Sequence, residues 1–127
     1  MSKFLLVGAR GFIGAVLRYY VSGWVQRAAD NATFPYGTLI VNLTGCFAIG
    51  VLSYLTDARG AFTPESRAFV FIGLLGGYTT FSSFGNETMA LLRDGESVPA
   101  LVNVGTHVIA GLGAVWVGRV LASLIWR

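Results

Sequence analysis

The sequence predicts an all-α integral membrane protein with four transmembrane helices in a single domain over residues 1–127. Of its residues, 54% are hydrophobic and 12% are charged, whereas a soluble domain carries about 25% charged residues. Four apolar stretches come close to the roughly 20 residues that a helix needs to cross a bilayer. The connections between these stretches are too short to hold a soluble domain.

Apolar composition and loop residues set the expected bounds of the four helices. The helices cover residues 4–25, 37–55, 68–92 and 98–122. Glycines and prolines mark two of the connections. Arginines interrupt the first apolar stretch and no small-x-small cleavage site follows it, so we expect a retained helix and not a signal peptide.

Seventeen glycines are many for a helical protein, because glycine disfavours helix in water. In lipid, small residues allow helix backbones to approach each other closely. We therefore expect tight helix packing. Four helices are also too few to enclose a hydrated path comfortably, so we expect the chain to form an oligomer.

Several functional classes find no support in the sequence. The net charge of +3 is not concentrated on a polar face, so nucleic acid is not an expected partner. The single cysteine, Cys46, lies in an apolar run and is expected to be a small core residue. Ser82 and Ser83 have no neighbouring base, and His107 is the one histidine. We expect neither an enzyme nor a transition-metal site.

The third expected helix contains its weakest helical window at residues 76–80. Two glycines are followed there by Tyr78, Thr79 and Thr80, and all five residues disfavour helix. A break near the midplane of the membrane is tolerated where the backbone lines a polar cavity or is buried in protein. Membrane transporters use such breaks to build ion sites. We expect a broken helix; the alternative is a continuous glycine-rich helix.

Two phenylalanines follow this window at a spacing of three residues. Phe81 and Phe84 would lie on one helix face, about 5–6 Å apart. The edge of a phenyl ring carries positive potential, so the pair offers a weak site for a small anion without a fixed charge. Phenylalanines at this spacing are more often found in a core or against lipid.

Uncharged polar residues recur in the second and fourth expected helices. Asn42 lies one turn after Thr38, and His107 lies one turn after Asn103. Because an unpaired amide is costly in lipid, Asn42 is either part of an interhelical hydrogen bond or a donor to a ligand. A lone histidine is more often a packing or hydrogen-bonding residue than a ligand.

Charged residues also lie inside the expected crossings. Arg18 and Glu87 are one to two turns from a helix end, whereas Arg10 and Arg119 lie nearer the ends. Charges in a crossing mark functional sites by default. The alternative is that these long side chains reach the membrane surface.

Taken together, these motifs resemble the Fluc-type fluoride channels, also called the CrcB family. The resemblance runs through most of the chain. It depends chiefly on residues 35–45 (PYGTLIVNLTG) and residues 76–84 (GGYTTFSSF), the latter followed by Glu87. Residues 14–19 (GAVLRY) and 100–104 (ALVNV) add to it.

The resemblance implies passive fluoride export that protects the cytoplasm of a bacterium from fluoride. It implies an antiparallel, dual-topology homodimer with two pores in the cell inner membrane. The carbonyls of Gly76 and Thr79 are implied to hold a structural sodium ion on the twofold axis.

The resemblance also implies roles for individual side chains. Phe81 and Phe84 would line the pore, and Asn42 would donate to the anion. Arg18 and Glu87 match vestibule positions. The family places a polar track along the fourth helix, where this chain has Asn103, His107 and Gly111. Because Gly111 has no side chain, the track is shorter here or is completed by Ser83 or Thr38.

Positive charges are divided weakly between the two sides of the membrane. One side carries Lys3, Arg59, Arg67 and Arg127, and the other carries Arg27 and Arg93. Four against two is a small bias, which favours insertion in both orientations.

Two rival functions stay open at this point. A small multidrug-type proton-coupled exporter is also a four-helix dimer, but such exporters resemble one another in a carboxylate deep in the first helix. This chain has none there, and its intramembrane acid is Glu87. A non-transporting membrane assembly subunit is the other rival, if the polar groups only join helices.

Overall fold

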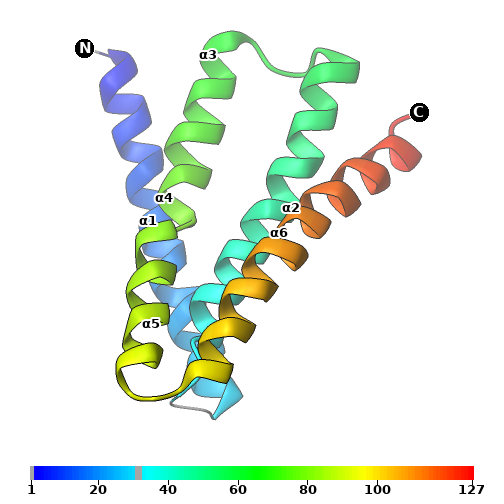
Figure 1. Ribbon diagram of the computed structural model, residues 1–127. Helices are drawn as coiled ribbons and strands as arrows, with labels where there is room; N and C mark the ends of the chain where they lie inside the picture. Colours follow the sequence, from blue (N-terminus) through cyan, green and yellow to red (C-terminus); the bar gives the residue numbers. More distant parts are fainter. Residues whose placement is uncertain (1, 31–32) are drawn as a thin grey trace.

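The computed structural model describes residues 2–30 and 33–127, and every regular element in these ranges is helical. Four stretches are long and apolar enough to cross a membrane, which confirms the four predicted helices. They are α1 (Ser2–Ala29), α2 (Tyr36–Arg59), an interrupted third span (Pro64–Arg93) and α6 (Ser97–Ile125) (Figure 1). The chain is therefore a multi-pass membrane protein by its fold.

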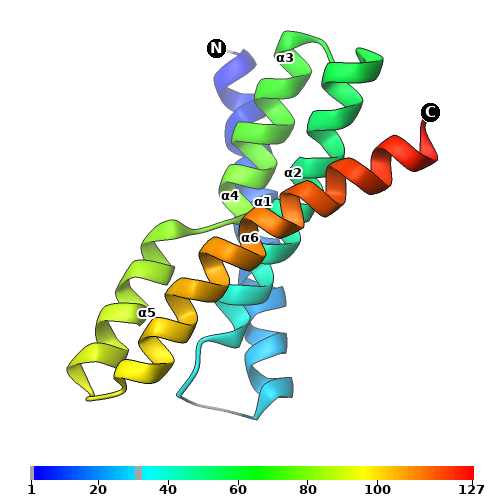
Figure 2. The same ribbon diagram turned by 45° about the vertical axis from the view of Figure 1, so that its right-hand side comes forward.

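The third span consists of four short helices in sequence. They are α3 (Pro64–Arg67), the π-helix η1 (Ala68–Leu75), α4 (Gly76–Tyr78) and α5 (Phe81–Arg93). Thr79 and Thr80 have extended backbones, with ψ of 159° and 112°. The break lies in the weak window, although Gly76 and Gly77 stay helical. Figure 2 shows α5 leaving the direction of α4 at this point.

The helices extend beyond the ranges that we expected from apolar composition. The largest change on the C-terminal side is in α1 and α2, which continue to Ala29 and Arg59. Apolar residues mark the part of a helix that lies in lipid, but backbone hydrogen bonds continue the helix into polar residues. α2 ends at Gly60, which adopts φ +58°, a conformation that glycine reaches without strain. α3 begins where the Thr63 side chain accepts a hydrogen bond from the Ser66 N–H.

Glycines allow the helices to approach closely, as expected for a protein in lipid. α1 packs against η1 and α4, and α2 packs against α6. A Cβ atom at Gly14 of α1 would clash with the backbone of Leu74 and Tyr78. A Cβ atom at Gly118 of α6 would clash with the Phe47 carbonyl of α2. α5 packs beside α6, so the break moves the second half of the third span from α1 to α6.

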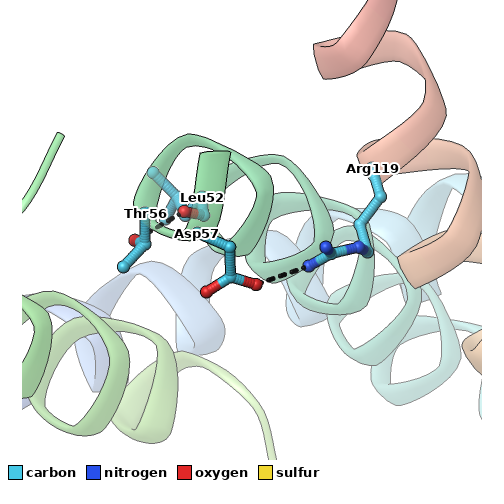
Figure 3. Close-up of polar contacts among 4 residues, drawn as sticks. All are labelled: Leu52, Thr56, Asp57 and Arg119. Atoms are coloured by element: carbon cyan, nitrogen blue, oxygen red, sulfur yellow. Dashed lines mark hydrogen bonds and ion pairs between the residues drawn. The ribbon is translucent and has the colours of Figure 1, made fainter. Parts of the chain in front are cut away.

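Polar contacts join the C-terminal ends of α2 and α6. Arg119 of α6 forms an ion pair with Asp57 of α2 at 3.2 Å (Figure 3). Beside this pair and within α2, the Thr56 hydroxyl donates to the Leu52 carbonyl at 2.8 Å. Arg59 donates to the Trp126 carbonyl. Arg119, which we expected near a helix end, therefore has its charge paired with that of Asp57. Because both side chains are exposed, this pair contributes about 0–1 kcal/mol.

Large apolar side chains cover the outside of α1 and α6. Phe4, Phe12 and Trp24 on α1 are more than half exposed, as are Ile109 and Trp116 on α6. A soluble monomer would not leave such extended apolar faces in water. Lipid or a second protein surface covers these faces in a membrane.

The close approach at Gly14 leads to a test with a matched control on the same helix. Gly14→Ala should lower the free energy of unfolding by about 1–3 kcal/mol, because the methyl group overpacks the contact. Gly8→Ala adds a methyl group where no atom lies within 4 Å, and it should leave stability unchanged or slightly raised. Unfolding by sodium dodecyl sulfate in detergent micelles measures both. Equal stability of the two variants would contradict the packing described here.

Candidate functional site

One side chain, Asn42 of α2, holds the helix break in place. Its Oδ1 accepts the Thr80 N–H at 2.9 Å, and its Nδ2 donates to the Thr80 carbonyl at 3.0 Å. The amide thus replaces the acceptor that the Thr80 N–H loses at the break, and it adds a second donor to the Thr80 carbonyl, which as the N-cap of α5 also accepts the first bond of that helix. Unpaired backbone groups are costly at membrane depth, so these two bonds stabilise the interrupted span. Of the two roles expected for Asn42, the structure shows the interhelical hydrogen bond.

The break also redirects the neighbouring backbone groups. In a continuous helix the Thr80 N–H would donate to the Gly76 carbonyl, but here it donates to Asn42. The Thr79 carbonyl accepts from Arg18 Nη1 at 3.4 Å. The Thr80 hydroxyl begins α5 by accepting the Ser83 N–H at 3.2 Å. The carbonyls of Gly76 and Thr79 are therefore released from helical pairing.

A cavity of about 400 Å³ lies beside the break, and we call it the aromatic cavity. Phe81, Phe84, Asn42, His107 and Cys46 are among its lining residues, together with Gly76 and Thr79. The ring centroids of Phe81 and Phe84 are 5.4 Å apart. Those of Phe84 and His107 are 4.3 Å apart. The three rings form a row that ends at Asn42.

A second cavity, of about 350 Å³, lies on the other side of Thr80, and we call it the polar cavity. Its lining includes Arg18, Thr38, Ser83 and Glu87. The Thr38 hydroxyl donates to Glu87 Oε1 at 2.8 Å, whereas the buried Glu87 Oε2 has no hydrogen-bond partner among the described residues. Thr80 lines both cavities, so they meet at the helix break.

All but one of the predicted site residues line one of these cavities. Asn103 is fully buried between α6 and α5 and donates to the Thr88 hydroxyl at 3.0 Å. Its carbonyl lies 2.9 Å from His107 Nδ1. Asn103 therefore contacts the aromatic cavity through His107 and not through its own side chain.

Thr80 and Cys46 are among the lining residues that the sequence analysis did not assign to the site. Thr80 connects the cavities, and its position three residues before Ser83 is typical of a residue that caps a helix. Cys46 lies one turn after Asn42, so helical spacing alone places it on the same face. The aromatic cavity thus offers rings, an amide and apolar groups, whereas the charged residues Arg18 and Glu87 line the polar cavity.

The fold and the site define a small multi-pass membrane protein with two cavities that share Thr80 at a broken helix. Residues 5–119 match the family described as "CrcB-like protein, Camphor Resistance (CrcB)". The chain is 44% identical over 121 residues to a protein of Rhizobium meliloti named "Fluoride-specific ion channel FluC", covering 95% of this chain and 96% of that relative. It is 43% identical over 122 residues to "Fluoride-specific ion channel FluC 1" of Methanosarcina acetivorans, covering 96% and 92%. The chain belongs to the CrcB family.

The contact between Asn42 and Thr80 can be tested through stability. Asn42→Leu keeps the approximate size of the side chain but leaves the Thr80 N–H unpaired and removes one donor from the Thr80 carbonyl, so the free energy of unfolding should fall by about 1–3 kcal/mol. Thr106→Val is the control, because the Thr106 hydroxyl bonds to carbonyls of its own helix. Unfolding in detergent micelles compares them. A loss in Thr106→Val as large as that in Asn42→Leu would contradict a special role for Asn42.

Proposed function

We propose that this protein is a channel that conducts fluoride passively across the membrane and thereby protects the cell against fluoride. The family and the names of its relatives support this function. Within the structure, the supporting observation is the row of Phe81, Phe84 and His107 that leads to Asn42 at a helix break. Transport through such a row involves no bond making or breaking, so the protein is not an enzyme.

The chemistry of the two cavities suits a small, strongly hydrated anion. An ion that sheds water needs many weak donors, and it must be held loosely enough to leave again. The described residues that line the aromatic cavity include no Lys, Arg, Asp or Glu. Ring edges and an amide supply weak positive potential there. Arg18 in the polar cavity adds a fixed charge outside the narrow row, as a vestibule requires.

We further propose that the channel is an antiparallel homodimer in the bacterial inner membrane, with two pores. Phe81 is 82% exposed in the single chain, which is unexpected for a pore ring unless a second copy covers it. The apolar faces of α1 and α6 leave room for both a partner and lipid. A nearly even division of Lys and Arg favours insertion in both orientations, and antiparallel pairing gives a twofold interface.

A structural sodium ion is the third part of the proposal. The Gly76 carbonyl has lost its helical donor to Asn42, and the Thr79 carbonyl attracts the Arg18 guanidinium. Hard cations prefer oxygen ligands, so these two carbonyls fit a sodium ion. One chain offers two of them, and a second copy across a twofold axis would complete a set of four. A bound cation would add positive potential for a nearby anion.

The rival functions are less well supported. A proton-coupled exporter would need a carboxylate deep in α1, where the sequence has none. An assembly subunit would not need a row of rings beside a cavity. Purified protein in liposomes separates the three functions. Voltage-driven fluoride efflux on a fluoride electrode, with chloride efflux as the control, indicates a channel. Proton-coupled drug flux indicates the exporter, and neither activity indicates the subunit.

The phenylalanine pair gives a sharper test of the pore. Phe81→Ile and Phe84→Ile remove the ring quadrupole but keep the side chains apolar, so each should slow fluoride efflux at least tenfold. A swap of this kind usually costs less than about 1.5 kcal/mol of stability, so dimer content and melting should stay near those of the parent. Intact dimers with the parental rate of efflux would show that the two rings only pack in the structure and do not bind fluoride.

Removal of sodium tests the proposed cation site. Fluoride efflux should fall when sodium is replaced by a large organic cation on both sides of the membrane, because the carbonyls at the two breaks lose their shared partner. Return of sodium should restore the rate. The control replaces sodium with the same cation in protein-free liposomes. Undiminished efflux without sodium would show that the site is not needed for conduction.

A further inference from the structure

A chain of hydrogen bonds runs from the helix break to α6, and its proton positions can be assigned. Asn42 Nδ2 donates one hydrogen to the Thr80 carbonyl and lies 3.1 Å from His107 Nε2. The orientation of the Asn42 amide is determined by Thr80. Exchanging its oxygen and nitrogen would place oxygen against the Thr80 carbonyl and NH₂ against the Thr80 N–H.

The tautomer of His107 follows from its other nitrogen. Nδ1 lies 2.9 Å from the Asn103 carbonyl, one turn earlier on α6. A carbonyl can only accept, so Nδ1 carries the hydrogen of the neutral ring and Nε2 carries the lone pair. Nε2 then accepts the second Asn42 hydrogen. Both hydrogens of the Asn42 amide are consumed inside the protein.

We propose that His107 is a positioning residue that occupies the second Asn42 hydrogen, so that Asn42 donates to a permeating anion when the His107 ring turns away. This inference rests on the proposed channel function. It adds what controls whether the Asn42 amide can donate to the anion. His107 packs on Phe84 at a centroid distance of 4.3 Å. The ring is therefore next to the path in either position, and an anion competes with Nε2 for the same hydrogen.

Protonation of His107 removes the acceptor. A proton on Nε2 would face Asn42 Nδ2, which is itself a donor, because the two bonds to Thr80 hold the amide with Oδ1 turned toward the Thr80 N–H. The ring must then turn, which releases one amide hydrogen for the anion. The positive ring adds its own attraction for a negative ion. Acid conditions therefore favour the state in which the second Asn42 hydrogen is free to bind the anion.

Other titratable groups face this region and must be separated from His107. On α2, Cys46 lines the same cavity, and its thiol is uncharged on the acid side of neutrality. On α5, Glu87 lies one turn after Phe84 and bonds to Thr38 in the polar cavity. On α1, Arg18 contacts the Thr79 carbonyl. Glu87 is thus the competing source of a pH response.

Two substitutions distinguish these sources by fluoride efflux from liposomes between about pH 8 and pH 5. Parental efflux should rise roughly 2- to 10-fold toward acid, the factor of one hydrogen bond. His107→Gln offers an amide oxygen to the same Asn42 hydrogen but does not titrate, so its efflux should be the same at every pH in this range. His107→Ala frees the hydrogen at every pH, so its efflux should be flat and higher. Efflux from protein-free liposomes is subtracted at each pH.

A measurement that does not depend on transport tests the same geometry. The chain has one histidine, so histidine-selective ¹⁵N labelling gives the spectrum of a single ring. The spectrum at neutral pH should show the tautomer with hydrogen on Nδ1. The opposite tautomer would overturn the inference, as would a parental pH response in His107→Gln, which would point to Glu87. Absence of fluoride efflux at every pH, with the expected tautomer, would refute the proposed function instead.

Discussion

The paired hydrogen bonds between the Asn42 amide and the Thr80 backbone are the contact on which the site depends. Two extended residues in the middle of a membrane span would otherwise present unpaired groups to a medium without water. An amide side chain is suited to this contact because it offers an acceptor and a donor at the same spacing as a peptide group. With Thr80 held, α5 starts in a new direction and brings the two phenylalanines beside α6.

The break also separates charged from uncharged surroundings. Arg18 and Glu87 lie in the polar cavity, whereas the aromatic cavity is lined by rings, an amide and apolar groups among the described residues. A fixed charge in the aromatic cavity would bind an oppositely charged ion strongly and slow its release. A charge in the polar cavity can attract the ion without holding it beside the rings. Thr80, which lines both cavities, lies at the boundary between the two environments.

Much of this arrangement could be predicted from the sequence, and the missing parts have clear physical reasons. Long apolar stretches predicted the four spans, and the weak window at residues 76–80 contained the break. The ends of the helices were longer than expected, since hydropathy reports contact with lipid and not backbone hydrogen bonding. Asn103 lies one turn before His107, so we expected both side chains to line the same cavity. The Asn103 side chain is instead buried against Thr88. Spacing along one helix does not reveal which side chain a neighbouring helix covers.

Two distinctive strings in the sequence contact each other in the structure. They are residues 35–45 (PYGTLIVNLTG) and residues 76–84 (GGYTTFSSF). Asn42 and Gly45 lie three residues apart on α2 and therefore share a face. Asn42 binds the backbone of Thr80, while a Cβ atom at Gly45 would clash with the side chain of Thr79. A larger residue at position 45 would push Thr79 away and with it the carbonyl proposed to bind sodium. The same strip of α2 thus sets both the amide beside the proposed anion path and the carbonyl at the proposed cation site. A change in the packing of α2 should therefore affect both ions together.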